Sequence, residues 1–561
     1  MTPRPSPPAA PAPWRRAPSG GAEVGRGRTG YQRTARRALL AAAVLLLAGC
    51  GPDGRDATVE EPDDTAHPED LAVDVEEGLD DDAFRPDDDC FGLAVTGLDG
   101  DEVSCGTVGV PLDHAEPGGE QIELAVAVIG GDDDHERPLL LLGGGPGEVM
   151  VETMLTEPAM QRAHDTGRET IVLDQRGVGN SRPALDCPRV DDDALQGTVD
   201  EDLAVMLDAL ADCREELAAD GTDLGAFNHR NNALDVHAVR AALGHEQIDL
   251  RGASYGTHVA LHAASLDPDG IGSLVLSSPV DPTSNYLHTA PGGFQRALDR
   301  VARACEADEA CGAGIGDLEQ AIAAAVAQLE ASPPEVTVEP PGGEETTLTV
   351  TPATFFRGLF TLFYLPDGAF ALPALVDRAR DGEVEQLARL LVTVEQQLED
   401  AIAVGMHVSM VCTGEGAQFD RHLALEGVSS ELLVEHWFER GMAGGGATHE
   451  TCDVWDVAAQ VDPGGLALPE QVPALVVTGG FDHVTPPQLG QRVADALATG
   501  HLVEVPTLGH APLEGLDRFV EGCGRGIVEQ FLDDPTRYPD TDCVEQLPPY
   551  RPMVELPDAA F

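Results

Sequence analysis

The chain has 561 residues, and its 98 acidic against 34 basic residues, all of them arginine, give a formal net charge of −64. The absence of lysine excludes Walker-type phosphate loops, pyridoxal Schiff bases, Ser-Lys dyads and protein-kinase sites, which need a lysine amine. Such an acidic chain also argues against a nucleic acid partner, because phosphate binding requires basic patches.

The amino terminus predicts an export signal. An arginine-rich flank precedes the apolar run 38–48, which is shorter than the roughly 20 residues that span a membrane. We expect residues 1–49 to be a signal peptide. The sequence LAGC, ending at Cys50, is similar to a bacterial lipobox, in which the cysteine sulfur is diacylated and anchors the protein outside the cytoplasmic membrane. A secreted protein with an incidental Cys50 is the alternative, and the export route, general or twin-arginine, stays open.

Residues 50–89 are mostly Asp, Glu, Pro, Ala and Gly and are predicted to form a disordered tether. Short apolar runs then alternate with helical periodicity, and Asn231–Gly244 is predicted to be a helix with a glycine stop. Continuous apolar runs are typical of strands in a mainly parallel sheet with helices on both faces. These runs are IELAVAVIG (122–130), PLLLLGGG (138–145), TIVLDQRG (170–177), IDLRGAS (248–254) and SLVLSSPV (273–280).

The alternation stops near Asp281, and the strand pattern returns at 473–480 and 501–506. Between them the chain is rich in Ala, Leu and Glu, with one β-prone patch, EVTVEPPGGEETTLTV. We therefore predict an α/β core formed by residues 90–284 and 466–561, with residues 285–465 inserted as a mainly helical cap.

The chain has 11 cysteines, and ten remain when Cys50 is set aside, enough for five disulfides in an oxidising compartment. Proximity in the sequence suggests the pairs Cys90–Cys105, Cys187–Cys213, Cys305–Cys311, Cys412–Cys452 and Cys523–Cys543. Buried free thiols are the alternative. The cysteines form no CxxC motif and are not grouped with histidines at zinc-ligand spacing, so no metal and no cofactor are expected.

The strand-like ends carry candidate catalytic residues. The run 248–254 leads into Gly252-Ala253-Ser254-Tyr255-Gly256, a GxSxG nucleophile elbow whose glycines permit a tight strand-to-helix turn. Asp482 and His510 follow the last two strands, and the order Ser, Asp, His is that of α/β-hydrolases. We expect Ser254 to be the nucleophile, His510 the general base, and Asp482 the group that orients the histidine. The adjacent His483 is interpreted as structural.

Acyl transfer also needs donors for an oxyanion. The glycine-rich loop GGGPG follows the strand-like run at 138–142. In this arrangement the backbone N–H groups of Gly144, Gly145 and Tyr255 are the candidate donors. A dinucleotide-binding loop is disfavoured because the GxGxxG spacing is missing and Pro146 lacks an N–H.

Taken together, GGGPG, DQRGVGNS (174–181), GASYGT, FDHVTPP and LGHAP resemble the prolyl-aminopeptidase-like serine peptidases, and among them the secreted tripeptidyl-aminopeptidase group. The resemblance covers residues 90–543 and implies an α/β-hydrolase fold with a cap. It also implies that Asp174 and Arg176 brace the loop behind the oxyanion hole, although a structural salt bridge explains them as well. Relatives commonly have histidine where this chain has Gly143.

Exopeptidases of this family bind the substrate's amino group through carboxylates contributed largely by the cap. Glu415 is the first choice here, with a solvated glutamate as the alternative. His258 and His262 lie four residues apart on one helix, but HVALH lacks the glutamate of HExxH, so packing or exposure explains them. Aspartate runs at 80–82, 132–134 and 191–193 are interpreted as loops, with calcium left open.

The resulting hypothesis is a membrane-anchored serine exopeptidase that hydrolyses peptides from a free amino terminus through an acyl-enzyme. A carboxylesterase that acts on small esters with the same triad is the alternative enzyme. A binding lipoprotein that has lost catalysis is the alternative from another class. The preferred residues, the number of residues released and the oligomeric state are not determined by the sequence.

Overall fold

The computed structural model describes residues 83–95, 102–131, 137–156, 166–187, 199–339, 345–438, 448–460 and 466–556, together with Leu79, Ala159 and Ala163. Within these residues, none of the helices combines the length and the apolar character that crossing a bilayer demands. The proposed signal peptide, Cys50 and the three aspartate runs lie outside the described residues. Most of the proposed tether also lies outside them, but the prediction is wrong for its end, because Phe84–Pro86 pair with a neighbouring strand and so belong to the sheet.

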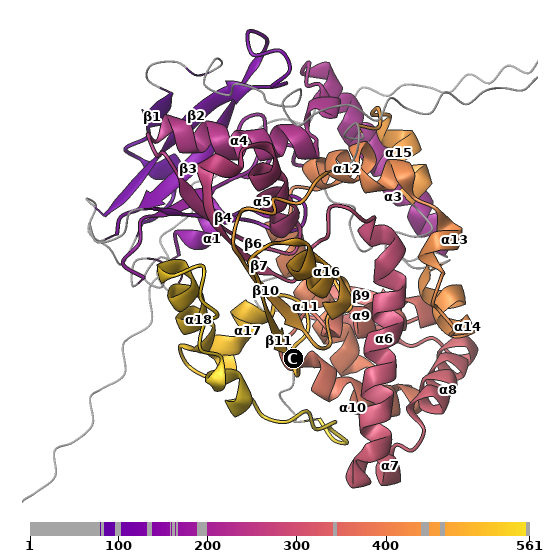
Figure 1. The fold of residues 1–561 in the computed structure, drawn as a ribbon. Helices are drawn as coiled ribbons and strands as arrows, with labels where there is room; N and C mark the ends of the chain where they lie inside the picture. Colours follow the sequence, from indigo (N-terminus) through magenta and orange to yellow (C-terminus); the bar gives the residue numbers. More distant parts are fainter. Residues whose placement is uncertain are drawn as a thin grey trace, which may run out of the picture. The chain divides into compact units, whose positions relative to one another are not determined.

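Nine strands form one sheet in the order β1-β2-β3-β5-β4-β6-β7-β10-β11 (Figure 1). The pairings from β5 to β11 are parallel, whereas those that join β1, β2, β3 and β5 are antiparallel. The strands are β1 (Phe84–Pro86), β2 (Val103–Pro111), β3 (Gln121–Ile129), β4 (Leu139–Leu142), β5 (Thr170–Leu173), β6 (Ile248–Ala253), β7 (Ile271–Ser277), β10 (Ala474–Gly479) and β11 (Gly500–Val505).

Alternate residues of the parallel strands contribute to two different hydrophobic cores. In β10, Val476 packs with α4 (His229–Ala242), α5 (Tyr255–Leu266) and α16 (Pro487–Ala496). Its neighbour Val477 packs with helices α17 (Pro512–Phe519) and α18 (Cys523–Asp533) in the other core. Since successive side chains of a strand point to opposite faces, the sheet is covered by helices on both sides. The predicted α/β-hydrolase fold is thereby confirmed.

The described residues between β7 and β10 are mainly helical. A third hydrophobic core, rich in phenylalanine, lies mainly in this inserted segment and also includes Phe481 and Leu556. The β-prone patch forms a two-stranded antiparallel hairpin, β8 (Glu335–Val338) and β9 (Thr346–Thr349). The helices are α6 (Tyr286–Ala307), α7 (Glu309–Gly314), α8 (Leu318–Ala331), α9 (Pro352–Leu362), α10 (Gly368–Arg380), α11 (Glu385–Ala401), α12 (Val404–Thr413), α13 (Arg421–Ala424), α14 (Glu431–Leu433) and α15 (Thr448–Trp455).

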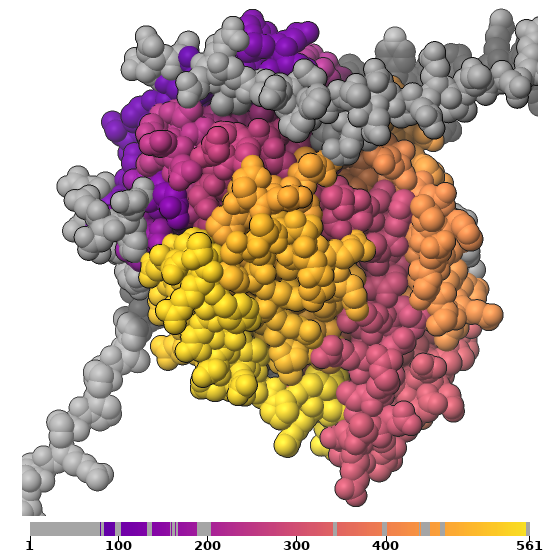
Figure 2. Space-filling view, viewed as in Figure 1, coloured from indigo at the N-terminus to yellow at the C-terminus, as the bar shows by residue number. Residues whose placement is uncertain are grey.

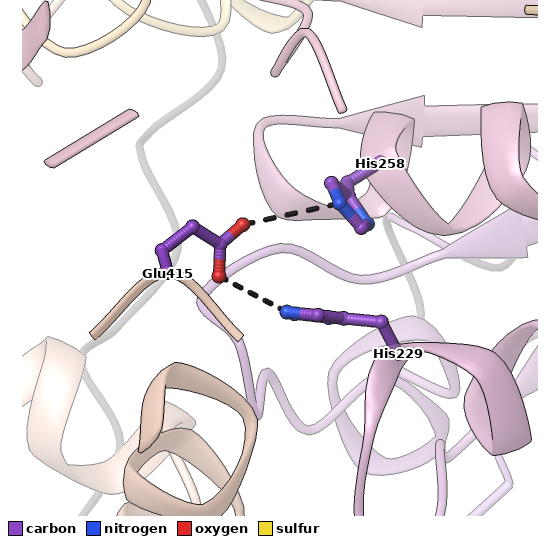
Figure 3. Close-up of side chains that lie close together, drawn as sticks. All are labelled: His229, His258 and Glu415. Atoms are coloured by element: carbon purple, nitrogen blue, oxygen red, sulfur yellow. Dashed lines mark hydrogen bonds and ion pairs between the residues drawn. The ribbon is translucent and has the colours of Figure 1, made fainter. Parts of the chain in front are cut away.

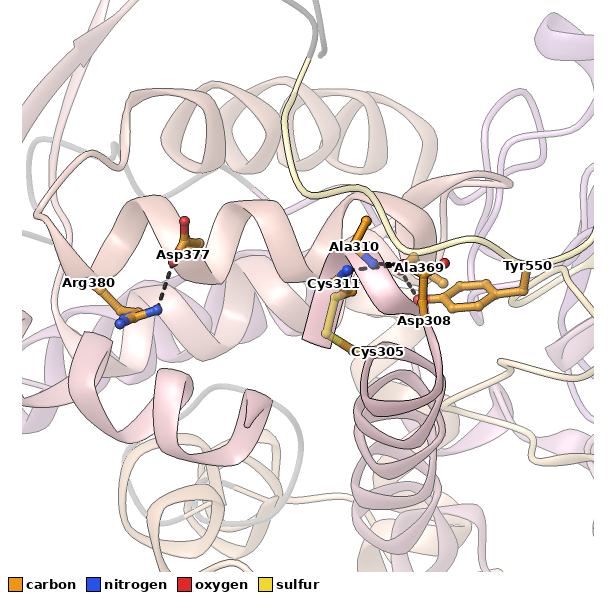
Figure 4. The surroundings of a disulfide bond; sticks show 8 residues. All are labelled: Cys305, Asp308, Ala310, Cys311, Ala369, Asp377, Arg380 and Tyr550. Carbon is orange, nitrogen blue, oxygen red and sulfur yellow. Dashed lines mark hydrogen bonds and ion pairs between the residues drawn. A yellow bond between two sulfur atoms is a disulfide. The ribbon is translucent and has the colours of Figure 1, made fainter. Parts of the chain in front are cut away.

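The remaining α-helices, α1 (Val151–Met154) and α3 (Val199–Ala219), precede the elbow strand β6. At the other end of the chain, the last described residues pack on the inserted segment. The Tyr550 hydroxyl donates to the Ala369 carbonyl at 2.8 Å (Figure 4). In the space-filling view the C-terminal segment, in yellow, accordingly borders the inserted segment, in rose (Figure 2).

The part of the chain that the structure describes contains five disulfides, and they are the five pairs suggested by proximity in the sequence. Cys305–Cys311 joins the end of α6 to α7, where the Asp308 carboxylate accepts the backbone N–H groups of Ala310 and Cys311, both at 3.0 Å (Figure 4). Disulfides at this density are typical of proteins in an oxidising compartment.

Candidate active site

Ser254 occupies the sharp turn between β6 and α5. Its backbone has φ 52° and ψ −123°, a conformation that is rare for a residue with a side chain. A Cβ on Gly252 would collide with the Gly256 carbonyl, and a Cβ on Gly256 would collide with Leu142 of β4. Both glycines are therefore required for the close approach of β4, β6 and α5, which holds Ser254 at the carboxyl edge of the sheet.

Asp482 follows β10, and His510 follows β11. Nδ1 of His510 lies 3.0 Å from each oxygen of the Asp482 carboxylate. Asp482 is fully buried. Burial opposes its ionisation, but the interaction with His510 outweighs burial and holds the pKa of Asp482 at about 2. The structure thus brings together a buried carboxylate and the imidazole that it orients, after strands β10 and β11, which β7 separates from the strand β6 that leads to Ser254.

Two further hydroxyl groups hold the Asp482 carboxylate. Ser278 Oγ donates to it at 2.6 Å and accepts the Ala511 N–H at 2.8 Å, so one side chain connects the ends of β7, β10 and β11. Thr485 Oγ1 donates to the same oxygen at 2.8 Å. Sequence reasoning treated Ser278 only as part of a strand, although a serine pair after an apolar run was a visible signal.

The inserted segment reaches this loop through two arginines of α6. Arg296 donates to the carbonyls of Gly480 and Asp482. Arg300 donates to the Gly480 carbonyl at 3.2 Å and to the Pro506 carbonyl at 2.9 Å. The backbone that presents Asp482 is therefore held by the inserted segment as well as by the sheet.

His483 lies apart from the Asp482–His510 pair. Its buried ring packs against Phe360 and Tyr364, with ring centroids 4.2 and 4.7 Å away. Burial lowers the pKa of His483 to about 3, so this imidazole is neutral. The environment is that of a packed aromatic cluster, as its structural interpretation anticipates.

The glycine-rich loop after β4 runs directly against the elbow. A Cβ on Gly144 would lie 3.5 Å from the Cβ of Ser254. The Gly144 N–H, expected to be an oxyanion donor, donates instead to Glu148 Oε2 at 2.5 Å. This donor is thus engaged in the structure, and Glu148 has to move before the N–H can bind a substrate oxygen.

Glu148 is a site residue that the sequence analysis missed. Burial raises its pKa, the Gly144 hydrogen bond partly offsets that rise, and the nearby Glu514 adds to it. An acidic residue directly after GGGPG was the available signal, but nothing in the sequence indicates where its side chain points.

Asp174 and Arg176 have separate partners. Asp174 accepts the backbone N–H groups of Met150 and Val151, both at 2.8 Å, and so holds the chain that continues from the glycine-rich loop. Arg176 forms a buried salt bridge with Asp235 of α4, at 2.6 and 2.7 Å. Of the two alternatives from the sequence, bracing of the loop fits Asp174, and a structural salt bridge fits Arg176.

A cavity of about 590 Å³ lies between the core and the inserted segment, and Glu415, at the start of the 3₁₀ helix η7 (Glu415–Gln418), lines it. Glu415 Oε2 lies 3.0 Å from His229 Nε2, and Oε1 lies 3.9 Å from His258 Nε2 (Figure 3). Burial opposes ionisation of Glu415, but the two histidines outweigh it, and the pKa of Glu415 is about 2. The cavity therefore carries an ionised carboxylate at its wall.

The Glu415 cluster is connected to the elbow. His229 Nδ1 lies 3.0 Å from the hydroxyl of Tyr255, the residue directly after Ser254. Asn232 Nδ2 donates to the same hydroxyl at 3.3 Å. Burial raises the pKa of Tyr255, so the hydroxyl is neutral. The His229–Tyr255 contact thus connects the carboxylate cluster to the residue that follows the proposed nucleophile.

Comparisons with known proteins agree with this geometry. Residues 137–311 match the family model described as alpha/beta hydrolase fold, and residues 441–543 match the model described as TAP-like protein. The serine protease Hip1 of Mycobacterium tuberculosis (strain ATCC 25618 / H37Rv) is 25% identical over 424 residues, which cover 70% of this chain and 79% of that protein.

The tripeptidyl aminopeptidase of Streptomyces coelicolor is 30% identical over 200 residues, 33% of this chain and 36% of that protein. A crystal structure of proline iminopeptidase from Mycobacterium smegmatis aligns with 77% of this chain and 98% of its own, at 20% identity and a TM-score of 0.35. The chain is therefore an α/β-hydrolase. Its C-terminal region, residues 441–543, is similar to TAP-like proteins.

The contact between Glu148 and Gly144 yields a first test. We expect Glu148→Ala to raise kcat several-fold on an activated substrate, because the Gly144 N–H is released. One oxyanion donor is worth about 10²–10³ in rate. Glu152→Ala, which removes an exposed acid from the following helix, is the matched control. Steady-state kinetics of both variants test this expectation. A lower kcat for folded Glu148→Ala would contradict the view that Glu148 competes with the oxyanion for the Gly144 N–H.

Proposed function

We propose that the protein is a serine exopeptidase that cleaves peptides from a free amino terminus through an acyl-enzyme, with Ser254, His510 and Asp482 as its triad. The observation that carries the specificity is the ionised, largely buried Glu415 carboxylate at the wall of a cavity, which His229 links to the Tyr255 hydroxyl. The relatives named as a serine protease and a tripeptidyl aminopeptidase support the same reaction class.

In the proposed reaction, His510 donates its Nδ1–H to Asp482, which leaves Nε2 to accept the proton of the Ser254 hydroxyl. The serine oxygen attacks the scissile carbonyl carbon. The same imidazole then protonates the leaving amine, and water hydrolyses the acyl-enzyme by the reverse proton transfers. Because Asp482 stays ionised, it stabilises the imidazolium that forms between these steps.

The oxyanion of the tetrahedral intermediate is proposed to bind backbone N–H groups of Gly144, Gly145 and Tyr255. The position of the Gly144 loop against the Ser254 side chain supports this assignment. Glu148 is proposed to leave the Gly144 N–H when substrate enters, since the carboxylate and the oxyanion cannot share one donor.

Glu415 is proposed to bind the substrate's ammonium group. A carboxylate with few water contacts compensates the lost hydration of an ammonium ion better than an exposed one, provided that the charges pair directly. The side chain of Glu415 is 11% exposed, and its carbonyl oxygen accepts Asn285 Nδ2 at 2.7 Å, which fixes the backbone that carries it. A carboxylesterase would have no use for such a group.

The domain organisation proposed from the sequence complements this function. Residues 285–465 would form the cap that closes over the substrate, and the Glu415 cluster, which joins this segment to α4 and α5, supports that role. Residues 1–49 would be removed as a signal peptide. Cys50 would carry the lipid, and the part of residues 50–89 that precedes β1 would be the tether. The disulfides of the described part support an oxidising compartment outside the cytoplasm.

The nucleophile is tested directly. Ser254→Ala should lower kcat by about 10⁴-fold or more while the protein remains folded, because the other groups of a triad contribute little without the serine. A fluorophosphonate probe should label Ser254 in the mature protein and nothing in the variant. Labelling of the variant, or unchanged turnover, would show that another residue attacks.

The amine site is tested by removing the charge of Glu415. Glu415→Gln should lower kcat/KM for a free-amine tripeptide p-nitroanilide by about 10²-fold, mostly through KM, since a buried ion pair loses one partner. Small esters, which lack an ammonium, should be hydrolysed as before. Glu426→Gln, an exposed acid in the same inserted segment, is the matched control. Equal turnover of free and N-acetylated peptides by the wild type would favour the carboxylesterase.

The dependence of kcat/KM on pH distinguishes a peptidase that binds an ammonium group from an esterase. Asp482 and Glu415 both have a pKa of about 2, so both are ionised throughout the neutral and alkaline range and neither produces an alkaline decline. The substrate α-amino group loses its charge above about pH 8. We expect kcat/KM for a free-amine peptide to fall roughly tenfold per unit above that pH, whereas small esters stay level. Profiles between about pH 6 and 10 check this, and a level alkaline limb for the peptide would contradict ammonium recognition.

A further inference from the structure

Three potential ligand atoms converge at the wall of the 590 Å³ cavity. They are His229 Nε2 from α4, His258 Nε2 from α5 and a carboxylate oxygen of Glu415 from η7, and all lie within 4.8 Å of one another (Figure 3). No sequence motif predicts this cluster, because its members come from three separate segments. The HVALH pair considered from the sequence, His258 and His262, is not the one that converges.

We propose that His229, His258 and Glu415 bind a divalent transition-metal ion of the Zn²⁺ class, and that this ion and the substrate's ammonium group exclude each other. The binding half of this proposal is independent of the function proposed above. The exclusion half rests on it, because it uses Glu415 as the amine ligand.

The spacing of the ligand atoms suits such an ion. Zinc lies about 2.0–2.2 Å from imidazole nitrogen and carboxylate oxygen in a tetrahedral arrangement, which places its ligand atoms roughly 3.4 Å apart. Glu415 Oε2 lies 3.0 Å from His229 Nε2, and Oε1 lies 3.9 Å from His258 Nε2, on either side of that value. Side-chain rotations would bring one Glu415 oxygen and both imidazole nitrogens around a single ion.

The donor types select the metal. Two imidazoles with one carboxylate favour zinc, copper or nickel, whereas magnesium and calcium prefer an all-oxygen set. Three protein ligands leave a fourth position for water or another small ligand on the cavity side.

The surroundings hold the ligands in place. Histidines that bind metals usually form a hydrogen bond through their other ring nitrogen. His229 has such a partner, because its Nδ1 lies 3.0 Å from the Tyr255 hydroxyl. Glu415 is held by Asn285, which donates to its carbonyl at 2.7 Å. His258 and Glu415 are mostly enclosed, with side chains 8% and 11% exposed, so water competes weakly for them.

Metal binding is measured on the mature, disulfide-bonded protein after chelator treatment. Calorimetric titration with ZnCl₂ should give one saturable ion per chain. Co²⁺ should give the intense visible absorption of a four-coordinate site with nitrogen and oxygen ligands. Glu415→Gln and His258→Gln should each weaken binding by about 10-fold or more. His245→Gln, which breaks a peripheral histidine–glutamate pair with Glu169 at 2.9 Å, should bind as the wild type does.

The outcomes separate the two halves of the proposal. No stoichiometric binding by the wild type, or unchanged binding by both cluster variants, overturns the site. If the site binds, Zn²⁺ should inhibit free-amine peptide hydrolysis competitively and leave small-ester hydrolysis unchanged. Stoichiometric binding with non-competitive or no inhibition overturns the exclusion, while the metal site stands. Failure of the proposed peptidase activity itself leaves the Co²⁺ spectrum and the titration as independent readouts.

Discussion

A buried negative charge governs the architecture of the site. Asp482 is fully enclosed, so its carboxylate is stable only because His510, Ser278, Thr485 and neighbouring backbone groups point their donors at it. These donors come from the ends of three neighbouring strands, which the parallel register brings to one edge of the sheet. The arginines of α6 then bind the carbonyls of the same loop. The loop that carries Asp482 is thus held both by the sheet and by the inserted segment.

How far the sequence could predict this molecule depends on how local each signal is. The GxSxG elbow and the residues after the last strands were readable because each element needs only a strand and the turn that follows it. The antiparallel placement of β3 was not, since a strand buried on both faces has the same apolar pattern in either orientation. The five cysteine pairs were accessible because each closes a short loop.

Contacts between distant segments escaped the sequence. Glu148 lies only four residues from Gly144, yet its bond to the Gly144 N–H depends on the path of the loop in three dimensions. The cluster of His229, His258 and Glu415 joins residues up to 186 positions apart. Its members are individually ordinary in a chain with 98 acids and 17 histidines. They stand out only because all three line one cavity, which the sequence does not reveal.

The Cys412–Cys452 bridge has a consequence for when the site is assembled. It fastens α12 to α15 three residues before Glu415, and the Cys452 sulfur lies against the backbone of Gly416. The acid that faces the cavity is therefore positioned by a covalent bond formed only under oxidising conditions. A newly made chain still inside a reducing cell would hold that acid on a loosely tethered turn. Oxidation of this one cysteine pair would therefore decide when the carboxylate at the cavity wall becomes fixed.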